Sequence, residues 1–348
     1  MTFPTIAQLG ELSLIEEIKK MSSQKSRGVP VGIGDDAAVI QTRGKHLLVT
    51  TDMMVEGVHF DLHFITAYQL GFKLISVNVS DIYAMGGTPH YALLNIALLS
   101  RTPSAFFRMF LRGVKDALAL YRAVLVGGDL SSAKGGICLS ATLIGSALKY
   151  LLRSGARVGD RIYVTGHLGD SICGLHLLKK LKKTISLNLK DTTADIQSLR
   201  RKFSRMHPGS FRAGLSWKTA EPLLRRHLLP EARNSGKISR NATSMIDISD
   251  GLLIDLTRLC NESRTGARIY EEKIPVSKEM RETAGCFGMN PLKLAMTGGE
   301  DYELLFTAPK KKRIKAVYIG DIMDSERVII SASGQERVFS ARGYEHFR

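Results

Sequence analysis

The sequence has few cysteines, no long apolar run and no recognisable leader. Its four cysteines, Cys138, Cys173, Cys260 and Cys286, are scattered without a Cys-x-x-Cys pair, so neither a disulfide framework nor a thiolate zinc site is predicted. No stretch approaches the ~20 consecutive apolar residues that a membrane-spanning helix needs. The first residues lack the basic and then apolar segments of a secretory signal. We therefore expect a cytoplasmic protein without a membrane partner.

Several signatures of nucleotide and hydrolytic enzymes are also missing. The chain has no G-x-x-x-x-G-K-[ST] loop, no protein-kinase H-R-D and D-F-G set and no G-x-S-x-G elbow. A G-x-G-x-x-A match at residues 32–37 follows no convincing strand, and its two acids would repel a dinucleotide's pyrophosphate. His59 and His63 have a spacing that suits a metal pair, but no third ligand lies nearby. Zinc chemistry and P-loop or protein-kinase chemistry are therefore not expected.

The chain carries a large excess of positive charge. Lys and Arg number 49 against 33 Asp and Glu, a formal net charge of +16, which favours polyanionic partners. The basic residues gather at residues 179–183, 200–202, 225–226 and 310–313. Such runs usually lie on solvated faces, and no RNA-recognition, zinc-finger or helix-turn-helix pattern accompanies them. Nucleic acid is therefore not the expected partner.

Strand-like and helix-like segments alternate along the chain, a pattern typical of α/β and α+β folds. The predicted strands are residues 45–51, 123–127, 136–146 and 161–165, and the predicted helices are residues 68–85, 170–183 and 252–260. A polar, Gly-bearing stretch at residues 151–160 predicts the boundary between two domains, residues 1–150 and residues 151–348. Residues 184–236 are polar, basic and irregular, and we expect a helical excursion or a long loop there.

Acidic residues recur beside glycines and hydroxyls at the ends of apolar segments. They lie in Gly34-Asp35-Asp36, Thr50-Thr51-Asp52, Ser80-Asp81, Gly127-Gly128-Asp129, Asp247-Ile248-Ser249-Asp250-Gly251 and Gly298-Gly299-Glu300-Asp301. Ends of strands are where α/β proteins place ligand-binding groups. Clustered carboxylates repel one another unless a cation lies among them, and Mg²⁺ takes oxygen ligands of this kind together with substrate phosphates. The set predicts magnesium-dependent phosphate chemistry.

Each of these motifs also has a purely structural interpretation. Asp81 lies in a predicted helix with one narrow polar stripe, so it is either a hydrogen-bonded core aspartate or a metal ligand, since an unpaired buried carboxylate is costly. Asp247 and Asp250 flank a tight turn, where Ser249 or Asp250 could be the helix cap, but a cap would explain only one of the two acids. Asp129 follows a predicted strand, so its motif is either a plain turn or a phosphate and metal site. Six such motifs are hard to explain as independent turns.

Taken together, these residues resemble the thiamine-monophosphate kinase family. The matching segments are GIGDDAAVI (32–40), TTDMMVEGVHF (50–60), NVSDIYAMGGTPH (78–90), GGDLSS (127–132), RSGARVGDRIYVTGHLGDS (153–171), HLLPEAR (227–233), IDISDGLLIDL (246–256), GGEDYELLFT (298–307) and RGYEHF (342–347). They occur in that family's order over nearly the whole chain.

The resemblance implies a fold, an assembly and a reaction. The fold is an aminoimidazole ribonucleotide synthetase-like α/β (α+β) fold of two domains. Residues 1–150 would bind ATP and magnesium and pair their sheets across a homodimer, and residues 151–348 would complete the active site. The reaction is transfer of the γ-phosphoryl group of ATP to thiamine monophosphate, the last step of thiamine diphosphate biosynthesis.

The resemblance also implies residue roles. Several Mg²⁺ ions are expected at Asp36, Thr51, Asp52, Asp81, Asp129, Asp247 and Asp250. ATP contacts are expected from Thr51, Gly128, Asp129, Arg153 and Ser249, and thiamine monophosphate contacts from His59, Glu300 and Tyr344. The expected catalytic residues are Asp36, Asp81, Asp129 and Asp250. Because the chain offers no obvious nucleophile, we expect direct in-line attack by a terminal phosphate oxygen of thiamine monophosphate.

The sequence departs from the family pattern at Ala232, where the H-x-x-P-x-P-R segment usually has a second proline. Within the superfamily, selenophosphate synthetase would need a reactive Cys or selenocysteine near the N-terminus, and the hydrogenase maturation factor a C-terminal cysteine. This chain has neither, and aminoimidazole ribonucleotide synthetase fits the motifs near Asp250 and Glu300 poorly. The alternatives are another phosphate or amide acceptor within the superfamily, and nucleic-acid binding through the basic runs.

Overall fold

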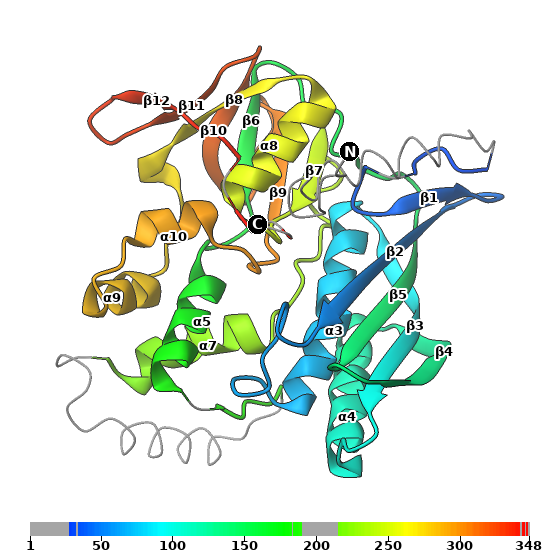
Figure 1. Ribbon diagram of the computed structural model, residues 1–348. Helices are drawn as coiled ribbons and strands as arrows, with labels where there is room; N and C mark the ends of the chain where they lie inside the picture. Colours follow the sequence, from blue (N-terminus) through cyan, green and yellow to red (C-terminus); the bar gives the residue numbers. More distant parts are fainter. Residues whose placement is uncertain are drawn as a thin grey trace, which may run out of the picture.

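Two β-sheets organise the protein. The computed structural model describes residues 28–32, 34–182, 184–189, 215–341, 343–344 and 346. In Figure 1, a five-stranded sheet lies on the right and a seven-stranded sheet lies at the top, with helices α5 and α7 below the second sheet. The α/β class expected from the alternating segments is confirmed.

The five-stranded sheet has the order β1-β2-β5-β3-β4. Its strands are β1 (Ala38–Gln41), β2 (His46–Val55), β3 (Thr88–Leu99), β4 (Val124–Ala133) and β5 (Cys138–Ala147). Neighbouring strands are antiparallel except β3 and β4, which helix α4 (Ser104–Tyr121) joins as a crossover. Helix α3 (Ala67–Ala84) packs on β2 and β5, and α4 packs on α3.

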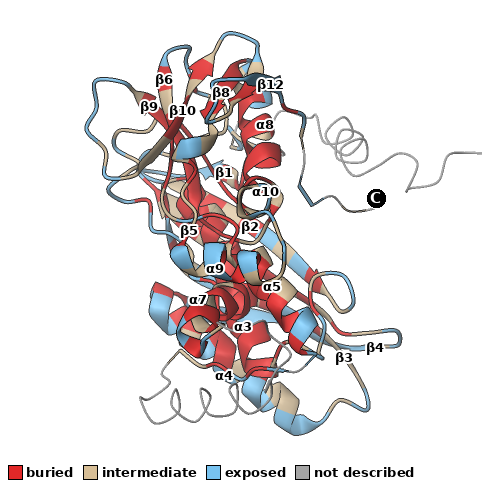
Figure 2. Ribbon diagram, turned by 90° about the vertical axis from the view of Figure 1, so that its left-hand side faces the viewer, coloured by how far each residue is buried: buried red, intermediate tan, exposed pale blue. Residues whose placement is uncertain are grey.

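Helix α3 is buried around its whole circumference (Figure 2). Every residue except Asp81 is buried, as expected for a helix that is largely apolar on all sides. Thr66 caps its N-terminus in a capping box with Gln69. Gly71 of α3 and Gly113 of α4 leave room for the two helix backbones to approach closely. Helix α3 is therefore the central helix of this half of the molecule, and Asp81 is its one partly exposed residue.

The seven-stranded sheet has the order β12-β11-β8-β10-β6-β9-β7 and is antiparallel apart from the β8–β11 pair. Its strands are β6 (Asp160–Val164), β7 (Ser244–Asp247), β8 (Gly266–Tyr270), β9 (Leu304–Pro309), β10 (Val317–Met323), β11 (Arg327–Ile330) and β12 (Glu336–Val338). The accompanying helices are α8 (Leu252–Ser263), the 3-10 helix η1 (Glu271–Lys273), α9 (Lys278–Cys286) and α10 (Pro291–Thr297).

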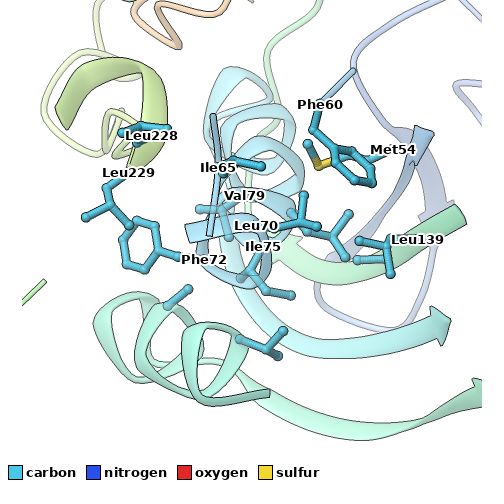
Figure 3. Close-up of a cluster of buried hydrophobic side chains, with 14 of the residues drawn as sticks. Met54, Phe60, Ile65, Leu70, Phe72, Ile75, Val79, Leu139, Leu228 and Leu229 are labelled. Atoms are coloured by element: carbon cyan, nitrogen blue, oxygen red, sulfur yellow. The ribbon is translucent and has the colours of Figure 1, made fainter. Parts of the chain in front are cut away.

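Helices α5 (Asp170–Leu181) and α7 (Trp217–Leu228) connect the two halves of the molecule. Leu228 belongs to the same buried apolar cluster as Phe72 of α3, and Figure 3 shows Leu228 and Leu229 beside Phe72. On their other side, Cys173 of α5 and Leu223 of α7 pack into the core of the seven-stranded sheet. One continuous apolar contact therefore runs from α3 to the second sheet.

Most predicted elements are confirmed, and one alternative interpretation is wrong. The helices predicted at residues 68–85, 170–183 and 252–260 correspond to α3, α5 and α8. The strand predicted at residues 123–127 extends further, as β4, so the alternative interpretation of Gly127-Gly128-Asp129 as a plain turn is wrong. These residues lie inside β4, because the strand keeps pairing with β3 as far as Ala133.

The irregular region predicted at residues 184–236 contains the regular helix α7. Residues 190–214, with the basic run at residues 200–202, lie outside the described residues. None of the described helices has the length and apolarity that crossing a bilayer requires.

Candidate functional site

Three carboxylates from distant parts of the chain meet where α3 approaches β7. Asp36 precedes β1, Asp81 lies in the last turn of α3, and Asp247 ends β7. One carboxylate oxygen of each lies within 4.8 Å of the others. Like charges at this spacing repel one another strongly in a buried site. An all-oxygen donor set of this kind suits Mg²⁺ rather than a softer metal.

Hydroxyl groups hold two of these carboxylates in place. Thr50 Oγ1 donates to Asp81 Oδ2 at 2.5 Å, and Ser80 Oγ donates to Asp247 Oδ2 at 2.7 Å. Because Ser80 belongs to the polar stripe of α3, the helix positions its own Asp81 and the Asp247 of the other sheet together. The cluster therefore depends on the contact between the two halves of the molecule.

Burial and mutual repulsion raise the pKa of the clustered acids. Burial raises the pKa of Asp81 well above its usual value, and the nearby charges of Asp52 and Asp247 add to the effect. Burial also raises the pKa of Asp247, with Asp36 as the next cause. Burial, Asp250 and Asp36 together raise the pKa of Asp52 to about 6. Five of the predicted metal ligands therefore influence one another's ionisation, and a bound cation would reduce the repulsion between their charges. They are Asp36, Asp52, Asp81, Asp247 and Asp250.

Two arginines offset part of this negative charge. Arg153 Nη2 lies 2.8 Å from Asp36 Oδ1, and the Arg153 backbone N–H donates to Asp35 at 2.6 Å. Arg258 Nη1 lies 2.5 Å from Asp250 Oδ2. Arg153 is thus at the cluster, where a forked guanidinium can also bind phosphate oxygens.

The turn between β7 and α8 leaves the Asp250 side chain available to the site. Gly251 is the N-cap residue of α8, with φ of +128°, and no N-cap side chain accepts a hydrogen bond there. Instead, Asp255 Oδ2 accepts the N–H groups of Asp250 and Gly251 at 3.1 and 3.0 Å. The interpretation of Ser249 or Asp250 as the helix cap is therefore wrong.

A strained segment places Glu300 beside this turn. Glu300 and Tyr302 both have positive φ, +63° and +49°, a conformation that such residues rarely adopt. The Glu300 N–H donates to the Ser249 carbonyl at 2.6 Å, and the Tyr302 N–H donates to the Ile248 carbonyl at 2.9 Å. Lys73 Nζ of α3 lies 2.7 Å from Glu300 Oε1. Hydrogen bonds to the turn that contains Ser249 thus stabilise this strained backbone conformation.

The three predicted substrate residues gather on this side of the site. The rings of His59 and His346 have centroids 4.9 Å apart, as do those of Tyr344 and His346. The Tyr344 N–H donates to the Asp250 carbonyl at 3.1 Å. Burial and then His346 lower the pKa of His59, against the opposing charge of Glu300. An aromatic wall and a carboxylate therefore lie next to the acidic cluster.

Two predicted ligands, Thr51 and Asp129, lie apart from this cluster. The strand register places Gly128 three strands from Asp52, about 14 Å at the usual strand spacing. Side chains alternate between the faces of a sheet, so the register puts Thr51 and Asp129 on the face opposite Asp52. A single chain does not bring Thr51, Gly128 and Asp129 to the acidic cluster, so their expected roles in metal and ATP binding stay predictions.

A second charge cluster was not predicted from the sequence. The Glu303 side chain is fully buried and pairs with Arg226 and Arg233, while Thr165 donates to it at 2.5 Å. Arg226 was expected on a solvated face, which is wrong, since its side chain is 12% exposed. No local pattern marks the Arg226–Glu303 pair, because 77 residues separate its members. The motifs HLLPEAR and GGEDYELLFT contain Arg233 and Glu303, whereas Arg226 directly precedes the first motif.

Comparisons with known proteins cover nearly the whole chain. Residues 34–147 match the family model of the AIR synthase related protein N-terminal domain, and residues 157–333 match that of the C-terminal domain. The chain is 35% identical to the thiamine-monophosphate kinase of Aquifex aeolicus, over 98% of this chain and 99% of that protein. It is 33% identical to that of Escherichia coli K12, over 97% and 98%. The solved structure of AaThiL complexed with AMPPCP and TMP superposes with a TM-score of 0.82, at 34% identity over 99% and 100% of the two chains.

Proposed function

The chain belongs to the thiamine-monophosphate kinase family, and we propose that it transfers the γ-phosphoryl group of ATP to thiamine monophosphate, yielding ADP and thiamine diphosphate. The family is shown by similarity over both sheets. The observation that carries the proposal is the meeting of Asp36, Asp81 and Asp247 next to Glu300, His59 and Tyr344. Under this proposal, the acidic cluster binds the phosphates, and the neighbouring Glu300, His59 and Tyr344 contact the organic part of the substrate.

Several Mg²⁺ ions are proposed at the acidic cluster. The residues fit such ions, because oxygen donors from Asp36, Asp81 and Asp247 converge within 4.8 Å and burial and repulsion raise the pKa of two of them. Asp52 and Asp250 are further proposed ligands. Bound there, the ions would offset the repulsion between two polyphosphates and the charge that develops on the transferred group.

The remaining side chains orient the two substrates. We assign ATP phosphate contacts to Arg153 and to Ser249 in the turn before α8, and thiamine monophosphate contacts to His59, Glu300 and Tyr344. Asp36, Asp81 and Asp250 are assigned as catalytic residues through the metal ions that they would hold. Phosphoryl transfer depends mainly on alignment and on stabilisation of charge, and these residues supply both.

The transfer itself is proposed to be direct. A terminal phosphate oxygen of thiamine monophosphate attacks the γ-phosphorus of ATP in line, the bond from that phosphorus to the β–γ bridging oxygen breaks, and ADP leaves. A phosphate monoester is largely ionised at neutral pH, with its second pKa near ~6, so the chain needs no strong general base. No protein nucleophile takes part.

The active form is proposed to be a homodimer. Met53, Tyr91 and Val124 are exposed and share the face of the five-stranded sheet that also carries Thr51 and Asp129. Covering this face with the same face of a second copy would bury its apolar side chains. Under this proposal, Thr51, Gly128 and Asp129 complete the ATP and metal site only in the assembled dimer.

The domain boundary at residues 150 and 151 is also a proposal. It falls between β5 and β6, the last strand of one sheet and the first of the other. Helix α7 lies after the boundary but packs against α3, and α5 packs against α7 and belongs to the same apolar cluster. The two domains would therefore hold one another through these helices.

The proposal is tested by incubating the purified protein with Mg²⁺, ATP and thiamine monophosphate and separating the products by chromatography. Thiamine diphosphate should form in equal amount to ADP, and [γ-³²P]ATP alone should leave no label on acid-precipitated protein. A stable phosphoprotein that passes its label to thiamine monophosphate would overturn direct transfer. Folded protein that binds ATP without making thiamine diphosphate would overturn the substrate assignment and favour another acceptor.

A further inference from the structure

Lys73 is a charged side chain in the most buried helix of the protein. Its side chain is 1% exposed, and its Nζ lies 2.7 Å from Oε1 of Glu300. The Glu300 side chain is 30% exposed, so this ion pair has a buried positive end and a partly open negative end. An unpaired buried ammonium group is costly, so the position of Lys73 is tied to the position of Glu300.

The other oxygen of Glu300 has a partner from a different helix. His227 Nδ1 of α7 lies 3.2 Å from Glu300 Oε2 and 3.1 Å from Ser171 Oγ of α5. Both contacts involve the same ring nitrogen, so these three residues do not form a Ser–His–Glu relay, in which the two imidazole nitrogens have separate partners. Instead, the contacts orient the Glu300 carboxylate. Lys73 of α3 contacts one of its oxygens, and His227 of α7 contacts the other.

The charges around Glu300 keep it ionised. Burial by itself would raise the pKa of Glu300, but Lys73 and His227 outweigh it and hold that pKa well below its usual value. Burial and then Lys73 lower the pKa of His227, against the opposing charge of Glu300. His59 and the Tyr302 hydroxyl are the other titratable groups that interact with Glu300. Of these groups, only Lys73 carries a fixed positive charge.

We infer that Lys73 is a positioning residue for the organic substrate: with His227 it orients the Glu300 carboxylate so that its exposed side accepts a hydrogen bond from the amino group of the substrate's aminopyrimidine ring. The inference rests on the proposed function. Because Lys73 already balances the charge of Glu300, the carboxylate recognises a neutral N–H donor and not the thiazolium cation. Lys73 itself touches no reacting atom.

The test compares Lys73→Met and Lys73→Arg with the wild type in steady-state phosphorylation. Lys73→Met should raise KM for thiamine monophosphate about 10- to 100-fold, the range expected for a misplaced hydrogen bond to a charged group, and leave KM for ATP within about twofold. Lys73→Arg should restore part of the loss. As the pH falls from 8 to 6, the KM of Lys73→Met for thiamine monophosphate should rise more than that of the wild type. The reason is that Glu300 takes up a proton more readily without its ammonium partner.

A double variant separates positioning from folding. Lys73→Met alone leaves a partly buried carboxylate unpaired, whereas Lys73→Met with Glu300→Gln removes both charges together. If Lys73 acts through Glu300, the double variant should have the same KM for thiamine monophosphate as Glu300→Gln alone. Ser76→Ala is the matched control, since Ser76 is a buried polar residue of the same helix that bonds Tyr121 and not the site. Its KM should equal that of wild type.

Two results would overturn the inference while leaving the proposed function in place. One is a loss in the double variant that equals the product of the two single losses. The other is an equal rise in KM for both substrates in Lys73→Met. Failure of the wild type itself to make thiamine diphosphate would instead overturn the proposed function.

Discussion

The acidic residues of the site lower the stability of the metal-free protein. Asp81 and Asp247 lie close together in the acidic cluster, and their raised pKa values reflect the unfavourable free energy of keeping both ionised. Among the proposed metal ligands, Arg153 directly contacts Asp36 and Arg258 directly contacts Asp250, while Arg258 also pairs with Asp255. The acids that reduce stability in the metal-free protein are therefore the same residues that are proposed to hold the metal ions.

Substitution of Asp52 by Asn should stabilise the metal-free protein at pH 8. The folded-state pKa of Asp52 is about 6 against an ordinary value of 3.8, so the folded state binds this proton more tightly than the unfolded state. The carboxylate therefore costs stability progressively as the pH rises from about 4 to 6, and the cost is constant above that. At pH 8 it is roughly 1–3 kcal/mol.

Thermal unfolding of wild type and Asp52→Asn, with and without Mg²⁺, measures this effect. Without the ion, the variant should have the higher Tm at pH 8 and nearly the same Tm at pH 4. Mg²⁺ should raise the Tm of the wild type more than that of the variant. A lower Tm for the metal-free variant at pH 8 would contradict the electrostatic account.

At the residue scale, the sequence predicted the acids but not their partners. Asp36, Asp81 and Asp247 stood out because each lies beside glycines or hydroxyls at the end of an apolar segment. The partners of Glu300 and Glu303 could not be recognised from the sequence. Ion pairs such as Lys73–Glu300 join helices and loops that are far apart in the sequence and come together only in the folded protein.

At the scale of elements, the contact between α3 and α4 determines where Asp81 stands. A Cβ on Gly71 would lie 2.2 Å from the Phe110 carbonyl oxygen, and a Cβ on Gly113 would lie 1.9 Å from the Tyr68 carbonyl oxygen. Both contacts involve backbone, which cannot move aside without separating the helices. The two glycines thus allow α4 to support the helix that carries the site.

Gly71→Ala and Gly113→Ala should each lower the free energy of unfolding by about 1–3 kcal/mol, the usual cost of overpacking. Gly285→Ala in α9 is the matched control, because a Cβ there meets nothing within 4 Å. It should be neutral or stabilising by up to ~1 kcal/mol, since Ala favours the helix. Urea unfolding of the three variants measures these values. Equal stability of all three would contradict the close-packing account.

Elements with a clear period were predictable, and those defined by tertiary contact were not. The apolar periodicity of residues 68–85 and 252–260 predicted α3 and α8. The continuation of β4 through Gly127 and Gly128 depends on pairing with β3, and two consecutive glycines favour a turn when read locally. Helix α7 lies in a basic region, where the charges concealed its apolar face.

At the scale of the whole molecule, the five-stranded sheet has one face covered by helices and one face with exposed apolar side chains. Met53, Tyr91 and Val124 are 57%, 50% and 58% exposed, and β4 is an edge strand with nearly every residue exposed. Monomeric proteins rarely leave such an edge open. The same face carries Asp129, so assembly and catalysis are proposed to depend on the same surface.

Val124→Lys should convert the proposed dimer to a monomer and reduce phosphorylation at least about tenfold. A lysine there would be buried without a partner in the proposed interface. Val158→Lys is the control, because Val158 is similarly exposed, at 62%, but lies outside that sheet. Light scattering after size exclusion gives the mass of each variant. A monomeric wild type with full activity would contradict the proposed assembly.

The most direct test of the central claim is the rate of thiamine diphosphate formation by wild type and Asp81→Asn over a series of Mg²⁺ concentrations. The account predicts that Asp81→Asn loses at least about 100-fold in kcat at saturating Mg²⁺, while its metal-free form unfolds at the same temperature as wild type or higher. The loss would then come from the missing ligand and not from unfolding. A folded Asp81→Asn variant with wild-type kcat and unchanged Mg²⁺ dependence would contradict the claim that this carboxylate cluster holds the metal ions for phosphoryl transfer.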